Sequence, residues 1–178
     1  MPGPSFKRGE TVALHTLEAE DLAFVQRLQN VPEVRDGMTF AHPRNAEDVE
    51  EWFEEHVSDT DEEEGAQFVI CVDGSPVGMA SLFRVTRPES HAEIAYSVDP
   101  DERGDGYATE AAELLVDYAI NERRLHKVAA RALVTDEASR AVLERVGFTQ
   151  EELQREEMLV DGERVDVARY GLLEDEWR

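Results

Sequence analysis

The sequence contains little cysteine and little positive charge, and each shortage argues against particular chemical roles or binding partners. Its single cysteine, Cys71, lies in the apolar run FVICV, which favours a buried strand residue over a nucleophile, so we assign it no chemical role. Only 18 lysines and arginines stand against 41 acidic residues, for a formal net charge of −23. Nucleic acids and anionic membranes bind proteins through cationic contacts with phosphates, so this charge argues against both as partners.

Long apolar segments are also missing. No apolar run approaches the length that spans a bilayer, and the opening residues MPGPSFKRGE lack the apolar stretch of a secretory signal. We therefore expect a cytoplasmic protein.

What remains is a globular composition, with 41% hydrophobic and 33% charged residues. A chain of 178 residues is long enough for one apolar core, so residues 1–178 are expected to form a single domain. The acidic residues are spread over the whole chain, as in VEEWFEEHVSDTDEEE. This spread favours a halophilic adaptation, in which salt screens a high charge, and leaves attraction of a cationic substrate as the alternative.

Hydrophobic periodicity predicts mixed α and β structure. Alternating apolar residues predict strands at 11–17, 67–73, 76–85, 91–98, 127–134, 148–160 and 164–173. Helical spacing predicts four helices, over 18–30, after Asn45, after Gly106 and after Asp136, with Asn45 and Asp136 as caps. The acidic segment 59–65 is expected to be a solvated loop. An antiparallel meander therefore precedes a strand–helix–strand unit.

The stretch RGDGYATEA, residues 103–111, sets two glycines at the mouth of a predicted helix. The first turn of a helix has unpaired backbone amides and the positive end of the dipole, so it binds phosphate without many basic side chains. Gly104 and Gly106 have no side chain to keep a phosphate from these amides, and Ala108 is small. Arg103 adds one positive charge at the rim.

Known phosphate-binding motifs fit this stretch unequally. A Walker loop requires GxxxxGK followed by Ser or Thr, and no such string occurs. The Rossmann fingerprint GxGxxG matches at Gly104 and Gly106, but Thr109 occupies the third glycine position and a meander precedes it. Taken alone, the glycine pair is equally compatible with a simple helix entry turn.

A third motif extends over most of the chain. Arg103, Gly106 and Ala108 fit the pattern Gln or Arg, two residues, Gly, one residue, Gly or Ala, which resembles the signature of the GNAT superfamily of acetyl-CoA-dependent N-acetyltransferases. The stretch AEIAYSVDPDERGDGYATEA resembles the ribosomal-protein alanine N-acetyltransferase branch. DEASRAVLERVGF is similar to that family's NxxS…GF element, and DGERVDVARYGLLEDEW resembles its last hairpin.

This resemblance implies an α+β, GNAT-like acyl-CoA N-acyltransferase fold, with a mostly antiparallel sheet flanked by about four helices. The sheet would splay open between strands 91–98 and 127–134, and acetyl-CoA would lie in the gap. Residues 104–109 would hold its pyrophosphate on backbone amides, and 96–98 would pair with its pantetheine arm. The residues that the resemblance assigns to the cosubstrate are Tyr96, Ser97, Val98, Arg103, Gly104, Asp105, Gly106, Tyr107, Ala108, Thr109, Asp136 and Ser139.

Direct acetyl transfer requires a neutral amine, a stabilised oxyanion and a departing thiolate. Glu93 is our candidate for the base, with a structural or ammonium-binding carboxylate as the equal alternative, and an amide near Val98 is the candidate for the oxyanion. Many family members carry a tyrosine acid before the GF element, but Leu143 stands there. Ser139 is then the candidate to deliver a proton through water, with an ordinary helical serine as the alternative. Asp136 replaces the usual Asn, which favours a helix cap over a pantetheine contact.

The partners follow from the same resemblance. The histidines at positions 15, 42, 56, 91 and 126 show no paired spacing typical of metal ligands, so no metal is expected. The implied function is acetyl transfer from acetyl-CoA to a primary amine, with a protein N-terminus favoured. The alternatives are a small amine, such as a polyamine, antibiotic or amino-acid derivative, and a non-catalytic acyl-CoA-binding module. A monomer or homodimer is expected.

Overall fold

The computed structural model describes residues 2–38, 40–58 and 65–177, and the strands within these residues form one sheet. The strands are β1 (Ser5–Arg8), β2 (Val12–Thr16), β3 (Ala66–Val72), β4 (Ser75–Thr86), β5 (His91–Val98), β6 (Lys127–Leu133), β7 (Thr149–Val160) and β8 (Glu163–Leu173). Their order is β1-β2-β3-β4-β5-β6-β8-β7, and each neighbouring pair is antiparallel except β5 and β6. The expected loop at 59–65 lies outside the described residues except for Gly65.

The α-helices of the described residues are α1 (Leu22–Asn30), α2 (Pro32–Gly37), α3 (Ala46–Phe53), α4 (Tyr107–Asp117) and α5 (Glu137–Val146). The π-helical turns η2 (Glu54–Ser58) and η4 (Tyr118–Glu122) extend α3 and α4, and the 3-10 turns η1 (Ala19–Asp21) and η3 (Pro100–Glu102) precede α1 and α4. None of the helices described here has both the length and the apolar character needed to cross a bilayer.

Each predicted strand and helix is present, with its bounds shifted by a few residues, but two elements were not predicted. β1 has four residues that are largely exposed. α2 has six residues, begins with Pro32 and buries only Val34. Neither segment contains enough apolar residues to produce a periodic pattern. Within the described residues, the sheet is therefore flanked by five α-helices, where the sequence predicted about four.

Side-chain caps start α3 and α5, as predicted. The Asn45 side chain accepts a hydrogen bond from the Asp48 amide at 2.9 Å, and the Asp48 carboxylate accepts one from the Asn45 amide at 2.9 Å. At α5, Asp136 Oδ1 accepts a hydrogen bond from the Ser139 amide at 3.0 Å. Gly147, with a φ of 115°, ends α5 in the left-handed conformation.

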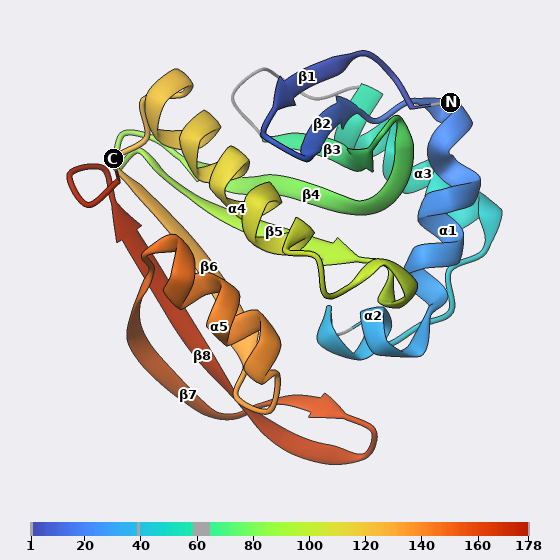
Figure 1. The fold of residues 1–178 in the computed structure, drawn as a ribbon. Helices are drawn as coiled ribbons and strands as arrows, with labels where there is room; N and C mark the ends of the chain where they lie inside the picture. Colours follow the sequence, from blue (N-terminus) through green and yellow to red (C-terminus); the bar gives the residue numbers. More distant parts are fainter. Residues whose placement is uncertain (1, 39, 59–64, 178) are drawn as a thin grey trace.

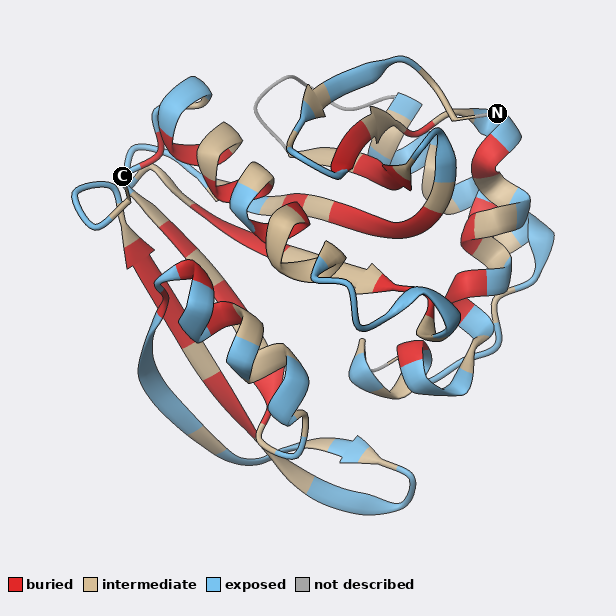
Figure 2. Ribbon diagram, in the orientation of Figure 1, coloured by how far each residue is buried: buried red, intermediate tan, exposed pale blue. Residues whose placement is uncertain are grey.

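Helices cover both faces of the sheet (Figure 1). Ile70 and Cys71 are neighbours in β3, so their side chains point to opposite faces, and each lies in a separate apolar core. Ile70 shares its core with Leu115 of α4, whereas Cys71 shares its core with Val25 of α1. Figure 2 shows buried residues along the central strands and a largely exposed β7 at the edge. Cys71 is 1% exposed, which confirms the predicted buried strand residue.

The sheet forks between β5 and β6 (Figure 1). These strands pair only at His91–Lys127, Ala92–Val128 and Glu93–Ala129, and they diverge beyond that point. β5 remains paired with β4 as far as Val98, and β6 remains paired with β8 as far as Leu133. The predicted splay between these two strands is confirmed.

Candidate active site

The glycine loop leads from η3 into α4 with two residues in the left-handed conformation. Gly104 has a φ of 108° and Gly106 a φ of 82°, values that strain any residue with a Cβ. A Cβ built at either position would meet no protein atom within 4 Å. The loop therefore requires glycine for its backbone conformation, and the space above it is open.

α4 begins directly after this loop. Its first intrahelical hydrogen bond runs from the Glu110 amide to the Gly106 carbonyl at 3.1 Å, so the preceding amides have no acceptor within the helix. The Nε atom of Arg103 donates a hydrogen bond to the Val98 carbonyl at 3.1 Å, which fixes this cation beside the end of β5. Amides without an acceptor in the helix and a nearby guanidinium are features that favour binding of an anion, even in a chain of high negative charge.

A cavity of about 330 Å³ lies over the glycine loop. Of the residues predicted to bind the cosubstrate, those that line it are Tyr96, Ser97, Val98, Arg103, Gly104, Gly106, Tyr107, Ala108, Thr109, Asp136 and Ser139. Asp105 is the predicted residue that is not part of the lining. The fork also leaves residues 94–98 of β5 without a β6 partner, so the backbone edge of this segment faces the gap.

The sequence reasoning missed part of this lining. Glu33, Val34, Gly37 and Met38 come from α2 and the residue after it, and α2 itself was not predicted. Arg145 lies on the same face of α5 as Ala138 and Val142, seven and three residues away, and both of these also line the cavity. This helical spacing could have predicted that Arg145 lines the cavity.

A second cavity, of about 130 Å³, lies within the fork and is lined by residues of both β5 and β6. Glu93 of β5, Arg131 of β6 and Phe83 of β4 are among its lining residues. Five residues line both cavities, and they are Gly37, Met38, Tyr96, Asp136 and Ser139. The two cavities therefore meet at these five residues.

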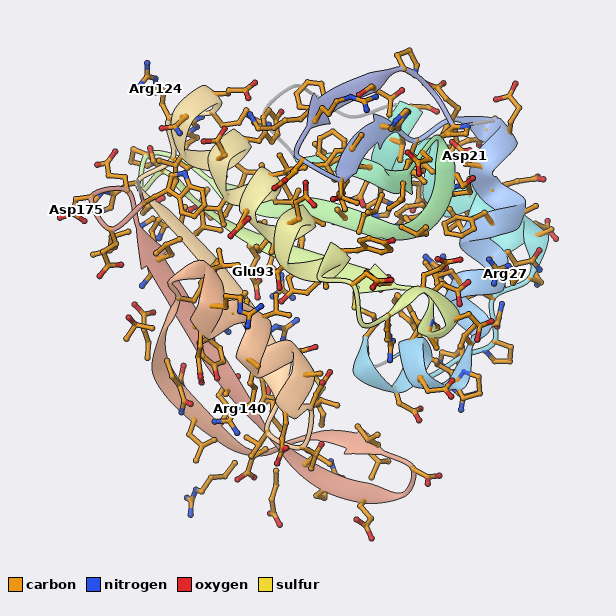
Figure 3. The ribbon with its side chains drawn as sticks, viewed as in Figure 1. Asp21, Arg27, Glu93, Arg124, Arg140 and Asp175 are labelled. Atoms are coloured by element: carbon orange, nitrogen blue, oxygen red, sulfur yellow. The ribbon has the colours of Figure 1, made fainter. Side chains whose placement is uncertain are left out.

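Glu93 lies at the vertex of the fork, between β5 and β6 (Figure 3). The residue is 4% exposed. Its Oε2 atom is 2.5 Å from Nη1 of Arg84, and its Oε1 atom is 3.1 Å from Nε of Arg131. The candidate base is thus a buried carboxylate with a guanidinium group at each oxygen.

Asp136 and Ser139 form a hydrogen-bonded pair where the cavities meet. The Ser139 hydroxyl donates to Asp136 Oδ2 at 2.7 Å, in addition to the bond from its amide. A Cβ built at Gly37 would lie 3.8 Å from Asp136 Oδ2, so α2 faces this carboxylate across the junction. Burial, followed by the charge of Asp136, raises the pKa of Tyr96 well above its ordinary value, which keeps the phenol protonated.

Leu143 and Asp136, the two positions that depart from the family pattern, both have structural roles. Leu143, at the position of the family tyrosine, is 1% exposed and lines the second cavity with its apolar side chain. Asp136 caps the start of α5 and also lines the cavity at the junction, so one residue does both.

Within the described ranges, no group of three or more His, Cys, Asp or Glu residues is arranged to hold a metal ion.

Comparisons with known proteins relate most of the chain to one family. Residues 11–149 match the family model of the acetyltransferase (GNAT) domain. YdaF of Bacillus subtilis (strain 168), which its name describes provisionally as a ribosomal N-acetyltransferase, is 39% identical over 113 residues, or 64% of this chain and 62% of YdaF. The spermidine N(1)-acetyltransferase of Escherichia coli (strain K12) is 26% identical over 168 residues, or 94% of this chain and 88% of that enzyme.

Solved structures share the same architecture. Spermidine N-acetyltransferase from Vibrio cholerae, crystallised with CoA and spermine, has a TM-score of 0.87 at 24% identity, over 94% of this chain and 98% of that chain. RimJ of Mycobacterium smegmatis, in complex with CoA-disulfide, has a TM-score of 0.82 at 25% identity, over 93% of this chain and 83% of that chain. The fold expected from the sequence is confirmed.

Proposed function

The chain belongs to the acetyltransferase (GNAT) family, and from this premise we propose that it transfers the acetyl group of acetyl-CoA to a primary amine. We propose further that the acceptor is a protein N-terminal amine, as in the ribosomal-protein alanine branch. The name of YdaF, which describes a ribosomal N-acetyltransferase, supports a ribosomal protein as the acceptor.

The observation that carries the proposal is the meeting of two cavities at the fork. Acetyl transfer in one step requires both substrates to be bound at once, with the amine beside the thioester carbon. The larger cavity would hold acetyl-CoA and the smaller cavity the acceptor. Tyr96, Asp136 and Ser139 line both, so the thioester would lie beside them.

Local groups would bind the CoA diphosphate in spite of the overall charge of −23. The amides of 104–109 and the Arg103 guanidinium act within a few ångströms, whereas distant carboxylates are screened beyond roughly 10 Å at moderate salt. The pantetheine arm would pair with the free edge of β5 at residues 96–98.

Three groups of the chain would then assist the transfer of the protons and the acetyl group. Glu93 accepts a proton from the acceptor ammonium, directly or through one water, and the neutral nitrogen attacks the thioester carbonyl. An amide near Val98 stabilises the oxyanion. As the carbon–sulfur bond breaks, the attacking nitrogen loses its second proton, which passes through water held by Ser139 to the departing CoA thiolate. Replacement of Glu93 by Gln should lower kcat about 100-fold, and an unchanged rate across pH would remove Glu93 from the mechanism.

A small amine is the second candidate acceptor. The spermidine acetyltransferase of Escherichia coli matches this chain over 88% of its length, which favours a polyamine. The second cavity favours a peptide, because a polyamine has ammonium groups beyond the one that reacts and the lining carboxylate Glu93 already pairs with two guanidinium groups. Asp136 likewise already accepts two hydrogen bonds from Ser139. A polyamine needs carboxylates that are free to pair with its ammonium groups.

Acetyl-CoA consumption at low and high salt would decide between these acceptors. The panel contains peptides that begin with Ala or Ser, the same peptides with a blocked N-terminus as matched controls, and spermidine. Turnover of the unblocked peptides alone is expected. Turnover of spermidine alone would change the acceptor to a small amine. CoA binding without turnover of any amine would indicate a non-catalytic acyl-CoA-binding module and overturn the proposed activity.

A further inference from the structure

Three strands bring charged side chains to one point at the vertex of the fork. Arg84 comes from β4, Glu93 from β5 and Arg131 from β6, and we call this set the Glu93 clamp. Arg84 contacts Oε2 of Glu93 at 2.5 Å and Arg131 contacts Oε1 at 3.1 Å. Since each oxygen has a different partner, the carboxylate is held against rotation.

Arg84 reaches Glu93 through an irregular backbone. The pairing of β4 with β5 shifts register between Phe83 and Thr86, and Arg84 within this bulge has a φ of 49°. A residue other than glycine adopts this left-handed conformation only at a cost in conformational energy. Bulges redirect side chains, and here the bulge directs Arg84 onto the carboxylate.

Arg131 joins the two strands beyond their last backbone pair. Glu93 pairs with Ala129 at the end of the β5–β6 ladder, and Arg131 lies two residues further along β6. The ion pair therefore spans the fork at the point where the strands separate. Arg131 also lines the second cavity, where its side chain is 30% exposed.

We propose that Arg84 and Arg131 are positioning residues, which orient the Glu93 carboxylate toward the acceptor cavity and set the width of the fork at its vertex. This inference depends on the proposed function, in which Glu93 receives the amine proton. The clamp is a weak source of stability, because burial of the Glu93 charge costs desolvation that offsets its attraction to the two exposed or half-exposed arginines. Glu93 and Arg131 line the wall of the acceptor cavity, which gives the clamp a role in orientation.

Steady-state kinetics of Arg84→Gln and Arg131→Gln test the proposal. Each change should lower kcat about 10- to 100-fold, because a displaced base loses alignment, while KM for acetyl-CoA changes by less than about 2-fold. The double variant Glu93→Gln, Arg131→Gln is compared with Glu93→Gln alone. Its kcat should be lower by less than about 2-fold, because no base remains to be positioned. Arg155→Gln, on the exposed strand β7, is the matched control and should retain wild-type kinetics.

Lysine variants separate positioning from folding. Arg131→Lys keeps the charge but loses the planar donor group, so its kcat should lie between those of the wild type and Arg131→Gln. Thermal unfolding shows which variants are folded. If the glutamine variants do not fold, the lysine variants replace them in the kinetic measurements. Wild-type kcat in both arginine variants, or full additivity with Glu93→Gln, would overturn the positioning role and leave acetyl transfer intact. If the wild type acetylates no amine, the proposed function and this inference both fall.

Discussion

The Nη1 atom of Arg27 lies 2.7 Å from Oδ2 of Asp99, and this ion pair joins α1 to the residue that follows β5. Asp99 Oδ1 also accepts a hydrogen bond from the Asp101 amide at 3.2 Å, which caps the turn before the glycine loop. Asp99 is only 7% exposed. The pair therefore anchors α1 to the loop on which the proposed cosubstrate site depends.

Loss of this ion pair should destabilise the protein only at pH values where Asp99 is ionised. Burial alone would raise the pKa of Asp99, but hydrogen bonds from Arg27 and the Asp101 amide outweigh burial and lower it. Stabilisation is therefore present above the unfolded-state pKa, about 4, and is lost as the pH falls through the lower folded-state value. Arg27→Gln should reduce the free energy of unfolding by about 1 kcal/mol at pH 7 and by less at pH 3. Urea titrations at the two pH values measure the free energy of unfolding, with Arg164→Gln as the control variant. An equal loss of stability at pH 7 and pH 3 would contradict the proposed dependence on the ionisation of Asp99.

Alanine variants of two glycines distinguish the effect of backbone strain from an effect on cosubstrate binding. Gly106 in the loop and Gly74 in the β3–β4 turn have φ values of 82° and 78°, and neither has a protein atom within 4 Å of a built Cβ. Alanine at either position should lower stability by about 1 kcal/mol. Only Gly106→Ala should also weaken CoA binding, by about 10-fold, as measured by calorimetry. An equal CoA affinity in both variants would place the diphosphate elsewhere.

Ser139→Ala tests the proposed path of the proton to the leaving thiolate. The variant should lower kcat about 10-fold and leave the dissociation constant of CoA within about 2-fold, because a relay acts only during reaction. Ser75→Ala, at the exposed first residue of β4, is the control. A loss of CoA affinity alone would make Ser139 a pantetheine contact, and no change in either quantity would make it an ordinary helical serine.

Cys71 should be chemically inert in the folded protein. Burial, followed by the charge of Asp21, raises the pKa of this thiol to about 11, so little thiolate exists at pH 8. A disulfide reagent should label the native protein at least about 100-fold more slowly than the urea-unfolded protein. Cys71→Ala should leave kcat unchanged, and rapid native labelling would show that the strand opens readily.

Much of the fold could be predicted because its signals are local. Alternation in FVICV places Ile70 and Cys71 on opposite faces of a strand, and Asn45 and Asp136 cap helices through bonds to residues three positions away. β1 and α2 were missed, since short exposed segments have no apolar periodicity. Without α2, the sequence could not show that Gly37 and Met38 complete the junction of the cavities.

The sequence by itself determined the glycine loop, because left-handed φ values at Gly104 and Gly106 are a property of single residues and α4 begins beside them. It also singled out Glu93 as a carboxylate near a predicted splay. Only the tertiary structure decided which groups surround that carboxylate. Arg84 and Arg131 reach it from two other strands, through a bulge and through the register of the fork, and neither feature can be derived from spacing along the chain.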